Sequence, residues 1–494
     1  MLARKLLIGF WLPLLLACAL LPNSAPTPAP TAILLLPTVV PASTPNTATD
    51  SPPPAENSPT ASLAVPTPPL PTPQRTTYRL TATLDYPNRS LTVHQTVRYV
   101  NDGAQPLEHL LLLVEGNRAP AVTHLSQAVW EDGKAIENAI LEGTQLSLPL
   151  PSPLPPNGVV AFQLQYTLYL PPRAGTLGFW RQTNFADWYP FVAARDAQGA
   201  WIVDFPGAVG EFLTYPLADF DVTLHIPANE PPLIVAAPAN AELSAENSLH
   251  YTHTAARTFA WSVSPDYLVL REEKDGVQYE SFYFSGYENA ARAALVANQQ
   301  AIALFSELYS PYQHNHLTVV IADFGDGMET DGLYWLGESY YQTYGDNQLN
   351  YLTMIAAHET AHNWWFGQVG NNPAQEPWLD EMLCLYSEKL FYERYYPTSA
   401  DWWWRFRIER HSPSGFANST IYDFLDFRPY VNAVYLRSAM FWDASRKQMG
   451  DEPFFAFLKA YNAQFSGQIA TRESFFALLS QYGWSEANQE GYFR

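Results

Sequence analysis

The residues best suited to chemistry form an H-E-x-x-H pattern from His358 to His362, and Glu381 follows after a gap of eighteen residues. On a helix, positions i and i+4 lie one turn apart on the same face, so both imidazoles can reach one metal ion. Glu359 is then placed to take a proton from a metal-bound water, and Glu381 can return on a second helix as the third ligand. Because catalytic zinc sites use three protein ligands and one open position, the pattern predicts a zinc hydrolase. The plainer alternative is a buried helix whose histidines only bond their neighbours.

Two helices are expected to carry these side chains. Leu349 to Trp365 is predicted to form one uninterrupted helix, closed by Gly367. Pro377 is favoured in the first turn of a helix, so a second helix is predicted to start there and to carry Glu381 in its first turn or so.

Four segments carry motifs in a fixed order. They are G-M-E from Gly327 to Glu329, H-E-T-A-H-N-W-W-F-G from His358, W-L-D-E ending at Glu381, and Y-L-R-S-A beginning at Tyr435. In order and spacing they resemble motifs of the M1 family of zinc aminopeptidases, the gluzincins related to aminopeptidase N and leukotriene A4 hydrolase. The resemblance covers most of residues 76–494, and four motifs together are far more specific than any one of them.

The resemblance implies a catalytic role for each position. His358, His362 and Glu381 would hold one Zn²⁺ ion, with a water in the fourth position whose pKa the metal lowers toward ~7. Glu359 would act as general base and then as proton donor to the leaving amine. The hydroxyl of Tyr435, together with zinc, would stabilise the oxyanion formed on the peptide carbonyl.

The resemblance also implies how a peptide with a free N-terminus is held. Glu329 would anchor the α-ammonium by charge-assisted hydrogen bonds, and Gly327 and Met328 would lie along the substrate backbone. The family has a second amine-binding Gln or Glu in its N-terminal domain, and Gln182 is the candidate here. These positions predict an aminopeptidase.

Some positions depart from the family pattern. The G-x-M-E-N motif reads D-G-M-E-T here, so Asp326 and Thr330 replace its first glycine and its asparagine. If the altered motif no longer binds the α-ammonium of the substrate, the chain would be a zinc endopeptidase of the same chemistry. A non-catalytic M1-like binding protein and a hydrolase of non-peptide substrates are further alternatives. No pattern in the sequence sets an oligomeric state.

The first residues predict export. Arg4 and Lys5 precede an apolar run from Leu6 to Ala17, which is too short to span a membrane and suits a signal peptide. L-L-A-C, ending at Cys18, resembles a bacterial lipobox. Residues 1–21 are therefore predicted to be a signal peptide with a lipobox, and lipidated Cys18 would anchor a short lipoprotein form of the family on the outer face of a bacterial membrane. An ordinary cleaved signal and an uncleaved anchor remain alternatives.

Residues 22–75 are predicted to be a disordered linker. Between Pro22 and Gln74 the chain has 16 of its 42 prolines, no Lys or Arg and no aromatic residue, so it cannot bury a core. Such a segment is a semi-extended spacer.

The predicted fold class is α+β. From Thr77 apolar and polar residues alternate in short runs, which predicts an antiparallel β domain over residues 76–271, saddle-like by resemblance. Residues 272–494 are predicted to form a thermolysin-like, mainly helical catalytic domain, beginning with a helix from Tyr287 to Tyr309 and a buried strand from Leu317 to Ala322. Many family members have a further large helical domain after the catalytic one. This sequence shows no such domain, so a more open substrate cleft is expected.

The charge of the chain argues against nucleic-acid partners, and its cysteine content argues against a disulfide. The formal net charge of −21 and the pI near 4.8 leave no basic surface for nucleic acid. Lipidation of Cys18 would leave Cys384 alone, so no disulfide forms within one chain. Cys384 is expected to be an inert core residue.

Overall fold

The structure is a computed structural model that describes residues 75–118, 122–245 and 247–494. All of these belong to one compact unit, Pro71–Arg494. The predicted export signal, Cys18 with its predicted lipidation, and almost all of the predicted linker lie outside the described residues. Within the described ranges, no helix is both long and apolar enough to cross a membrane. The division between two domains at residue 271 stays a prediction.

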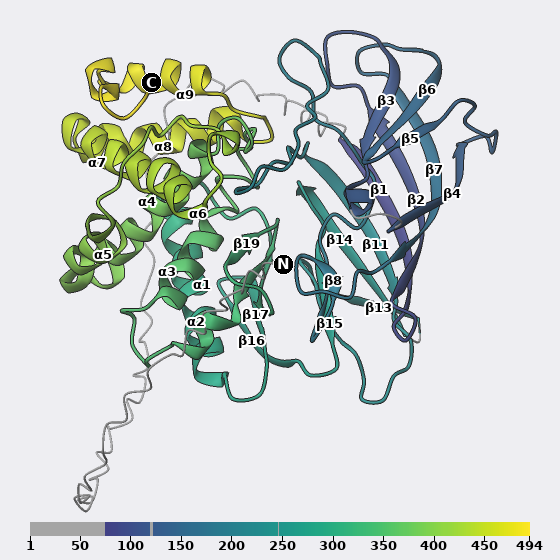
Figure 1. Cartoon of the computed structure of the whole chain (residues 1–494), viewed down its shortest axis with the longest axis horizontal. Helices are drawn as coiled ribbons and strands as arrows, with labels where there is room; N and C mark the ends of the chain where they lie inside the picture. The colour runs from purple at the N-terminus through teal and green to yellow at the C-terminus, as the bar shows by residue number, and fades with distance from the viewer. Residues whose placement is uncertain (1–74, 119–121, 246) are drawn as a thin grey trace, which may run out of the picture. The chain divides into compact units, whose positions relative to one another are not determined.

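Alternating side chains build the first sheet, as the sequence predicts. In β1 every second residue from Tyr78 to Leu84 is buried, while the intervening residues are partly or fully exposed. The sheet has seven strands (Figure 1), in the spatial order β13 (Glu242–Ala245), β14 (Ser248–Ala256), β11 (Ala218–His225), β1 (Thr76–Asp85), β2 (Ser90–Val100), β7 (Val159–Tyr169) and β4 (Thr123–Trp130). Only the β1–β11 pair of this sheet is parallel.

Two smaller sheets complete the β part. One has the order β10 (Phe191–Val192), β3 (Leu107–Leu113), β6 (Gln145–Leu154) and β5 (Ile140–Glu142). The other has the order β12 (Ile234–Ala236), β15 (Trp261–Ser264), β9 (Thr183–Phe185) and β8 (Leu177–Phe179). Side chains from all three sheets share one hydrophobic core, in which Phe185 stacks on Trp261 with ring centroids 3.7 Å apart.

A mixed sheet begins the second half. Its order is β16 (Leu268–Lys274), β17 (Val277–Tyr283), β18 (His316–Ala322), β20 (Leu333–Gly337) and β19 (Gly327–Glu329), so β19 is an edge strand. Every residue of β18 is buried, which matches the predicted buried strand. Helix α1 (Glu288–Leu308) packs on β17, and helix α3 (Tyr351–Ala361) packs on β19 and β20.

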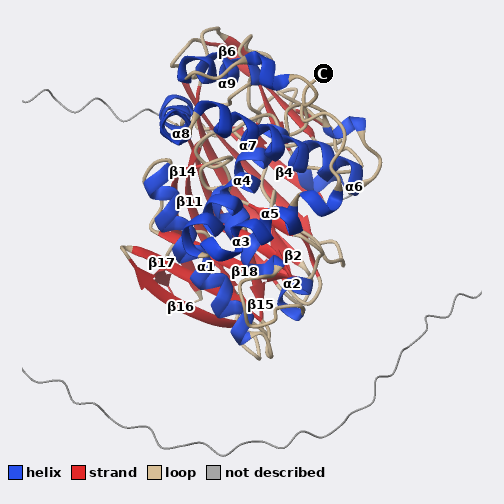
Figure 2. Cartoon of the chain, turned by 90° about the vertical axis from the view of Figure 1, so that its left-hand side faces the viewer, coloured by secondary structure: helices blue, strands red, loops and turns tan. Residues whose placement is uncertain are grey.

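Helices make up most of the remaining chain. They are α2 (Glu338–Gln342), α3 (Tyr351–Ala361), α4 (Trp378–Tyr395), α5 (Ala400–Arg407), α6 (Phe427–Tyr430), the π-helix η5 (Val431–Arg437), α7 (Ser438–Met449), α8 (Asp451–Phe465) and α9 (Arg472–Leu479). Short 3-10 helices are η1 (Glu115–Arg118), η2 (Pro397–Ser399), η3 (Glu409–His411), η4 (Ile421–Asp423), η6 (Ser480–Tyr482) and η7 (Glu486–Gln489). Helices α1, α3 and α4 pack against one another (Figure 2). Sheets followed by a helical region confirm the α+β class.

The predicted helix from Leu349 to Trp365 is shorter than expected. Asn350 caps its start by accepting a hydrogen bond from the Thr353 amide, but α3 ends at Ala361. The chain then turns, and the Trp365 carbonyl accepts a hydrogen bond from Nδ1 of His362. In a continued helix that carbonyl would point along the helix axis. The early end therefore orients a candidate ligand.

Arg257 joins the β part to the helical part. Its guanidinium donates to the carbonyls of Gly367, Gln368 and Gln468, and to that of Tyr215. Burial lowers its pKa to about 10. Because a buried charge is costly unless hydrogen-bonded, this network holds the two parts in one fixed arrangement beside the candidate site.

Candidate metal centre and active site

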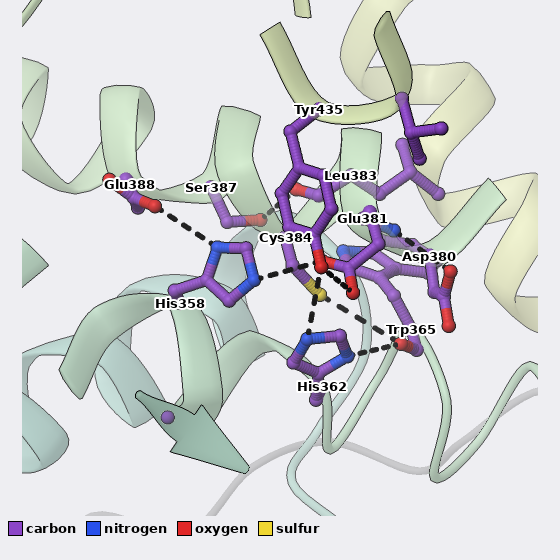
Figure 3. A network of polar contacts seen from close by, with 12 residues as sticks. His358, His362, Trp365, Asp380, Glu381, Leu383, Cys384, Ser387, Glu388 and Tyr435 are labelled. Atoms are coloured by element: carbon purple, nitrogen blue, oxygen red, sulfur yellow. Dashed lines mark hydrogen bonds and ion pairs between the residues drawn. The ribbon is translucent and has the colours of Figure 1, made fainter. Parts of the chain in front are cut away.

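Three potential ligands converge from α3 and α4. Nε2 of His358 lies 3.1 Å from Oε2 of Glu381, and Nε2 of His362 lies 3.8 Å from the same oxygen. One donor atom from each residue lies within 4.8 Å of the others, and all three residues are buried. Figure 3 shows both imidazoles directed at the Glu381 carboxylate. The structure thus brings together the three predicted metal ligands.

Outer hydrogen bonds fix both imidazole rings. Nδ1 of His358 donates to Oε1 of Glu388 at 3.0 Å, and Nδ1 of His362 donates to the Trp365 carbonyl at 3.1 Å (Figure 3). With Nδ1 protonated in each ring, Nε2 is left to face the cluster. Metal-binding histidines are commonly oriented in this way by a carboxylate or a carbonyl.

Glu388 is itself tightly held. It is 0% exposed, and Arg407 donates to its two oxygens at 3.0 and 3.1 Å. The indole of Trp403 donates to Oε2 at 3.1 Å. These contacts keep the Glu388 carboxylate ionised, because the Arg407 charge and the hydrogen bond from His358 lower its pKa although burial acts to raise it.

The cluster has the charge distribution of a site built for a cation. Burial acts to lower the pKa of His358, but hydrogen bonds to Glu381 and Glu388 outweigh it and raise that pKa to about 10. Burial lowers the pKa of His362 to about 4, although Glu381 opposes this. Burial acts to raise the pKa of Glu381, but the His358 hydrogen bond and the neighbouring imidazoles bring it below its usual value.

Glu359 points toward the same space. Its Oε2 is buried and has no hydrogen-bond partner among the described residues. Its carboxylate lies against the backbone of Gly327, where an added Cβ would be only 2.0 Å from Oε1. Burial raises its pKa well above the usual value, and the charges of Glu381, Asp326 and Glu211 add to this while His358 opposes it.

Tyr435 reaches the cluster from the π-helix η5. Its hydroxyl donates to Oε1 of Glu381 at 2.5 Å, and its ring is stacked on that of His358 with centroids 6.2 Å apart. Burial and the charge of Glu381 raise its pKa well above the usual value, so the phenol stays protonated. Single π-helical turns occur often at functional sites, where they redirect a side chain.

The predicted amine-binding segment is the edge strand β19. One oxygen of Glu329 lies within 4.8 Å of donor atoms of Glu359 and His362. The two altered motif residues have structural partners: Asp326 accepts from the Gly327 amide at 3.0 Å, and the Thr330 hydroxyl donates to the Leu333 carbonyl. The altered residues thus hold the ends of β19 and leave Glu329 facing the site.

A cavity of about 190 Å³ opens beside the cluster and is lined by Met328, Glu329, Asp380 and Glu211. Glu211 comes from the β part, and burial together with the charge of Glu381 raises its pKa to about 7. Gln182 does not line this cavity, because its side-chain amide donates to Asn184 at 2.9 Å. Sequence reasoning missed Glu211, since it stands in a loop with no motif around it.

Other titratable residues form separate contacts. His314 bonds Asp331 at 2.8 Å, whereas His316 bonds Asn240 and Thr318, so the two histidines do not share a site. His314, Asp331 and His253 do lie within 4.8 Å of one another, a grouping that the sequence does not reveal. Cys384 is buried, and burial raises its pKa, as expected for an inert thiol.

Solved structures share this architecture. A mutant M1 zinc metallopeptidase from Deinococcus radiodurans, bound to a Tyr-Ser-Ala substrate, is 20% identical with a TM-score of 0.61, over 84% of this chain and 92% of that one. The chain has the fold of the two-domain M1 zinc metallopeptidases. A two-domain M1 zinc metallopeptidase mutant bound to L-arginine matches at 19% identity and a TM-score of 0.60, over the same shares. No protein-family model and no curated protein sequence matches the chain.

Proposed function

We propose that this protein is a zinc aminopeptidase that removes residues from the free N-terminus of peptides. The observation that carries the proposal is that Glu329, which lies within 4.8 Å of His362 of the metal cluster, also lines a cavity together with Glu211. A cluster able to bind metal and carboxylates able to bind an amine thus share one space. The M1 zinc metallopeptidase fold supports the same chemistry.

The residues present fit zinc. Two imidazoles and one carboxylate are a set that zinc takes in catalytic sites, and the unpartnered Oε2 of Glu359 leaves a polar atom beside them for water. When bound there, zinc supplies Lewis-acid activation of water and of the scissile carbonyl. Glu388 and the Trp365 carbonyl hold the two imidazoles in the required orientation.

Glu359 and Tyr435 perform the proton and charge steps. Glu359 takes a proton from the attacking water and delivers it to the leaving amine, and its raised pKa suits both halves of that transfer. The Tyr435 phenol, which stays protonated, donates a hydrogen bond to the oxyanion formed on the scissile carbonyl.

Two carboxylates would hold the α-ammonium of the substrate. Glu329 has the role that the family resemblance gives it, and Glu211 takes the role for which Gln182 is the sequence candidate. Burial and the charges of neighbouring carboxylates raise the pKa of both groups, and a bound ammonium would offset that repulsion. The free edge of β19 offers Gly327 and Met328 for backbone hydrogen bonds with the peptide. The relatives that bind Tyr-Ser-Ala and L-arginine support a substrate with a free amine.

Peptides with free and with N-acetylated termini test the proposal. The zinc-loaded protein should hydrolyse only the free peptides, a chelator should abolish turnover, and Glu359→Gln should keep zinc but lose turnover. Glu211→Gln should raise KM for free-amine substrates, whereas Gln182→Asn, the matched control, should not. Cleavage of acetylated peptides would indicate an endopeptidase instead. Bound zinc without any turnover in the wild type would indicate a binding protein.

We further propose that the protein is exported and lipid-anchored through Cys18. The support is the charged and apolar start of the chain and its lipobox-like L-L-A-C. Radiolabelled palmitate should be incorporated into the wild type and not into Cys18→Ser. Equal labelling of the two proteins would refute the anchor.

A further inference from the structure

The cavity beside the metal cluster is lined by carboxylates that stand in different surroundings. Glu211 and Glu329 are two of these carboxylates. Burial raises the pKa of both; the charge of Glu381 adds to the shift of Glu211, and the charges of Glu211 and Glu359 add to that of Glu329. Asp187 also lines the cavity, but the charged groups that act on it are Glu115 and Arg118 from the β part. The cavity is therefore lined by a further carboxylate, which is hydrogen-bonded by Tyr215 and has charged neighbours of its own.

Asp187 is held in an unusual conformation. Its φ is 51°, in the left-handed region that few residues other than glycine adopt. Tyr215 donates to its Oδ1 at 2.7 Å. Burial raises the pKa of Asp187 to about 6, with the Tyr215 hydrogen bond opposing.

Two arginines lie near Asp187 or line its cavity, and each has a carboxylate neighbour of its own. Arg118 is paired with Glu115 at 2.6 Å, so these two largely cancel. Arg257 also lines the cavity, where its guanidinium donates to four backbone carbonyls and the Asp331 carboxylate acts on its charge. Aromatic rings, those of Tyr189, Phe212, Phe259 and Phe366 among them, line the remaining wall.

A carboxylate in a cavity with aromatic walls suits a cationic side chain. Ring faces attract cations, and a guanidinium or ammonium can accept both ring contact and a charge-assisted hydrogen bond. An apolar side chain would instead seal the carboxylate away from water without a partner, which is costly. An acidic side chain would be repelled.

We propose that Asp187 makes this cavity a subsite for a cationic side chain, so that the preferred N-terminal residue is arginine or lysine. The inference rests on the proposed aminopeptidase function: Glu211 and Glu329 hold the α-ammonium, and the side chain of that same residue enters the cavity they line. The cavity volume of about 190 Å³ admits a long side chain.

Arginyl and citrullinyl fluorogenic amides test the inference, because citrulline has nearly the shape of arginine without its charge. The zinc-loaded wild type should favour arginyl over citrullinyl by about 10- to 100-fold in kcat/KM. Asp187→Asn should bring this ratio close to one while changing leucyl amide hydrolysis by less than about 3-fold. Tyr215→Phe breaks the same hydrogen bond but keeps the charge, so it should retain the ratio.

Each other outcome has a defined meaning. A wild-type ratio near one, or an unchanged ratio in Asp187→Asn, overturns the inference. An equal loss for all substrates in Asp187→Asn shows a structural role and also overturns it. If the wild type hydrolyses no aminoacyl amide, the aminopeptidase proposal fails. Calorimetric binding of L-arginine and L-citrulline to zinc-loaded Glu359→Gln, with and without Asp187→Asn, then tests the subsite without turnover.

Discussion

Gly327 allows the candidate general base to lie against strand β19, and an added methyl group there would displace it. A Cβ at Gly327 would be 2.0 Å from Oε1 of Glu359 and 3.0 Å from Cγ2 of Ile355. Contacts below 3.0 Å are essentially never found for real Cβ atoms, so the carboxylate has to move by about 1 Å. It is the far end of a flexible side chain, so we expect Gly327→Ala to fold normally.

Catalysis should suffer although folding does not. A displacement of about 1 Å at a reacting group can cost on the order of 100-fold in rate. This corresponds to about 2.7 kcal/mol in transition-state stabilisation. The three metal ligands lie on α3 and α4 and are not touched by the new methyl group, so zinc content should remain that of the wild type.

The measurement combines kcat on an aminoacyl amide with zinc content and the melting temperature. Gly325→Ala is the matched control, because a Cβ at Gly325 would meet nothing within 4 Å. We expect a fall of roughly 100-fold in kcat for Gly327→Ala and less than about 3-fold for Gly325→Ala. Equal activities in the two variants would refute the placement of Glu359. Loss of zinc in Gly327→Ala would show that the damage reaches the ligands.

Three further perturbations probe the surroundings of the site. Arg407→Met leaves buried Glu388 without its cation, so apparent zinc affinity should fall by roughly 10- to 100-fold in a competitive chelator titration, and urea unfolding should show a loss of about 3 kcal/mol. An unchanged zinc affinity would contradict this. Tyr435→Phe should lower kcat by roughly 100-fold with little change in KM, and a change in KM alone would argue against oxyanion contact. Burial raises the pKa of Glu376 from 4.5 to about 7, so the folded state binds its proton more tightly than the unfolded state. Its stabilising effect is complete below pH 4.5 and is lost as pH rises to about 7. Glu376→Gln should therefore flatten the stability profile between these values, by on the order of 1 kcal/mol in urea unfolding, and a parallel profile would contradict it.

Local spacing is what made the metal ligands predictable. His358 and His362 are one helical turn apart, and Glu381 is near the start of the next helix, so the pattern depends on only two elements. The alternating strand beginning at Tyr78 was predictable for the same reason. The end of α3 was not, because it depends on the contact between His362 and the Trp365 carbonyl.

The residues that line the cavity could not be predicted in this way. Glu211 and Asp187 stand in loops of the β part, and Glu329 is on an edge strand more than a hundred residues away along the chain. Their approach depends on how the two parts pack, with Arg257 bonded across them. The spacing of residues within one segment cannot predict that these three distant carboxylates line one cavity. Gln182 was a reasonable candidate by position, but its amide is used within the β part by Asn184.

The role of Glu388 could be predicted in part, because its position in the sequence indicates a buried carboxylate that needs a cationic partner. It stands seven residues after Glu381 on α4, which places both carboxylates on one face of the helix, and Trp403 and Arg407 are four residues apart on α5. A charged residue on a buried helix face needs a partner of opposite sign, so a glutamate there indicates a cation on a neighbouring helix. What the sequence does not reveal is the packing of α5 on α4. This packing brings Arg407 to Glu388 and so connects His358, through Glu388, to a positive charge two contacts away. The orientation of the first histidine is therefore set by tertiary structure, although its position in the motif is not.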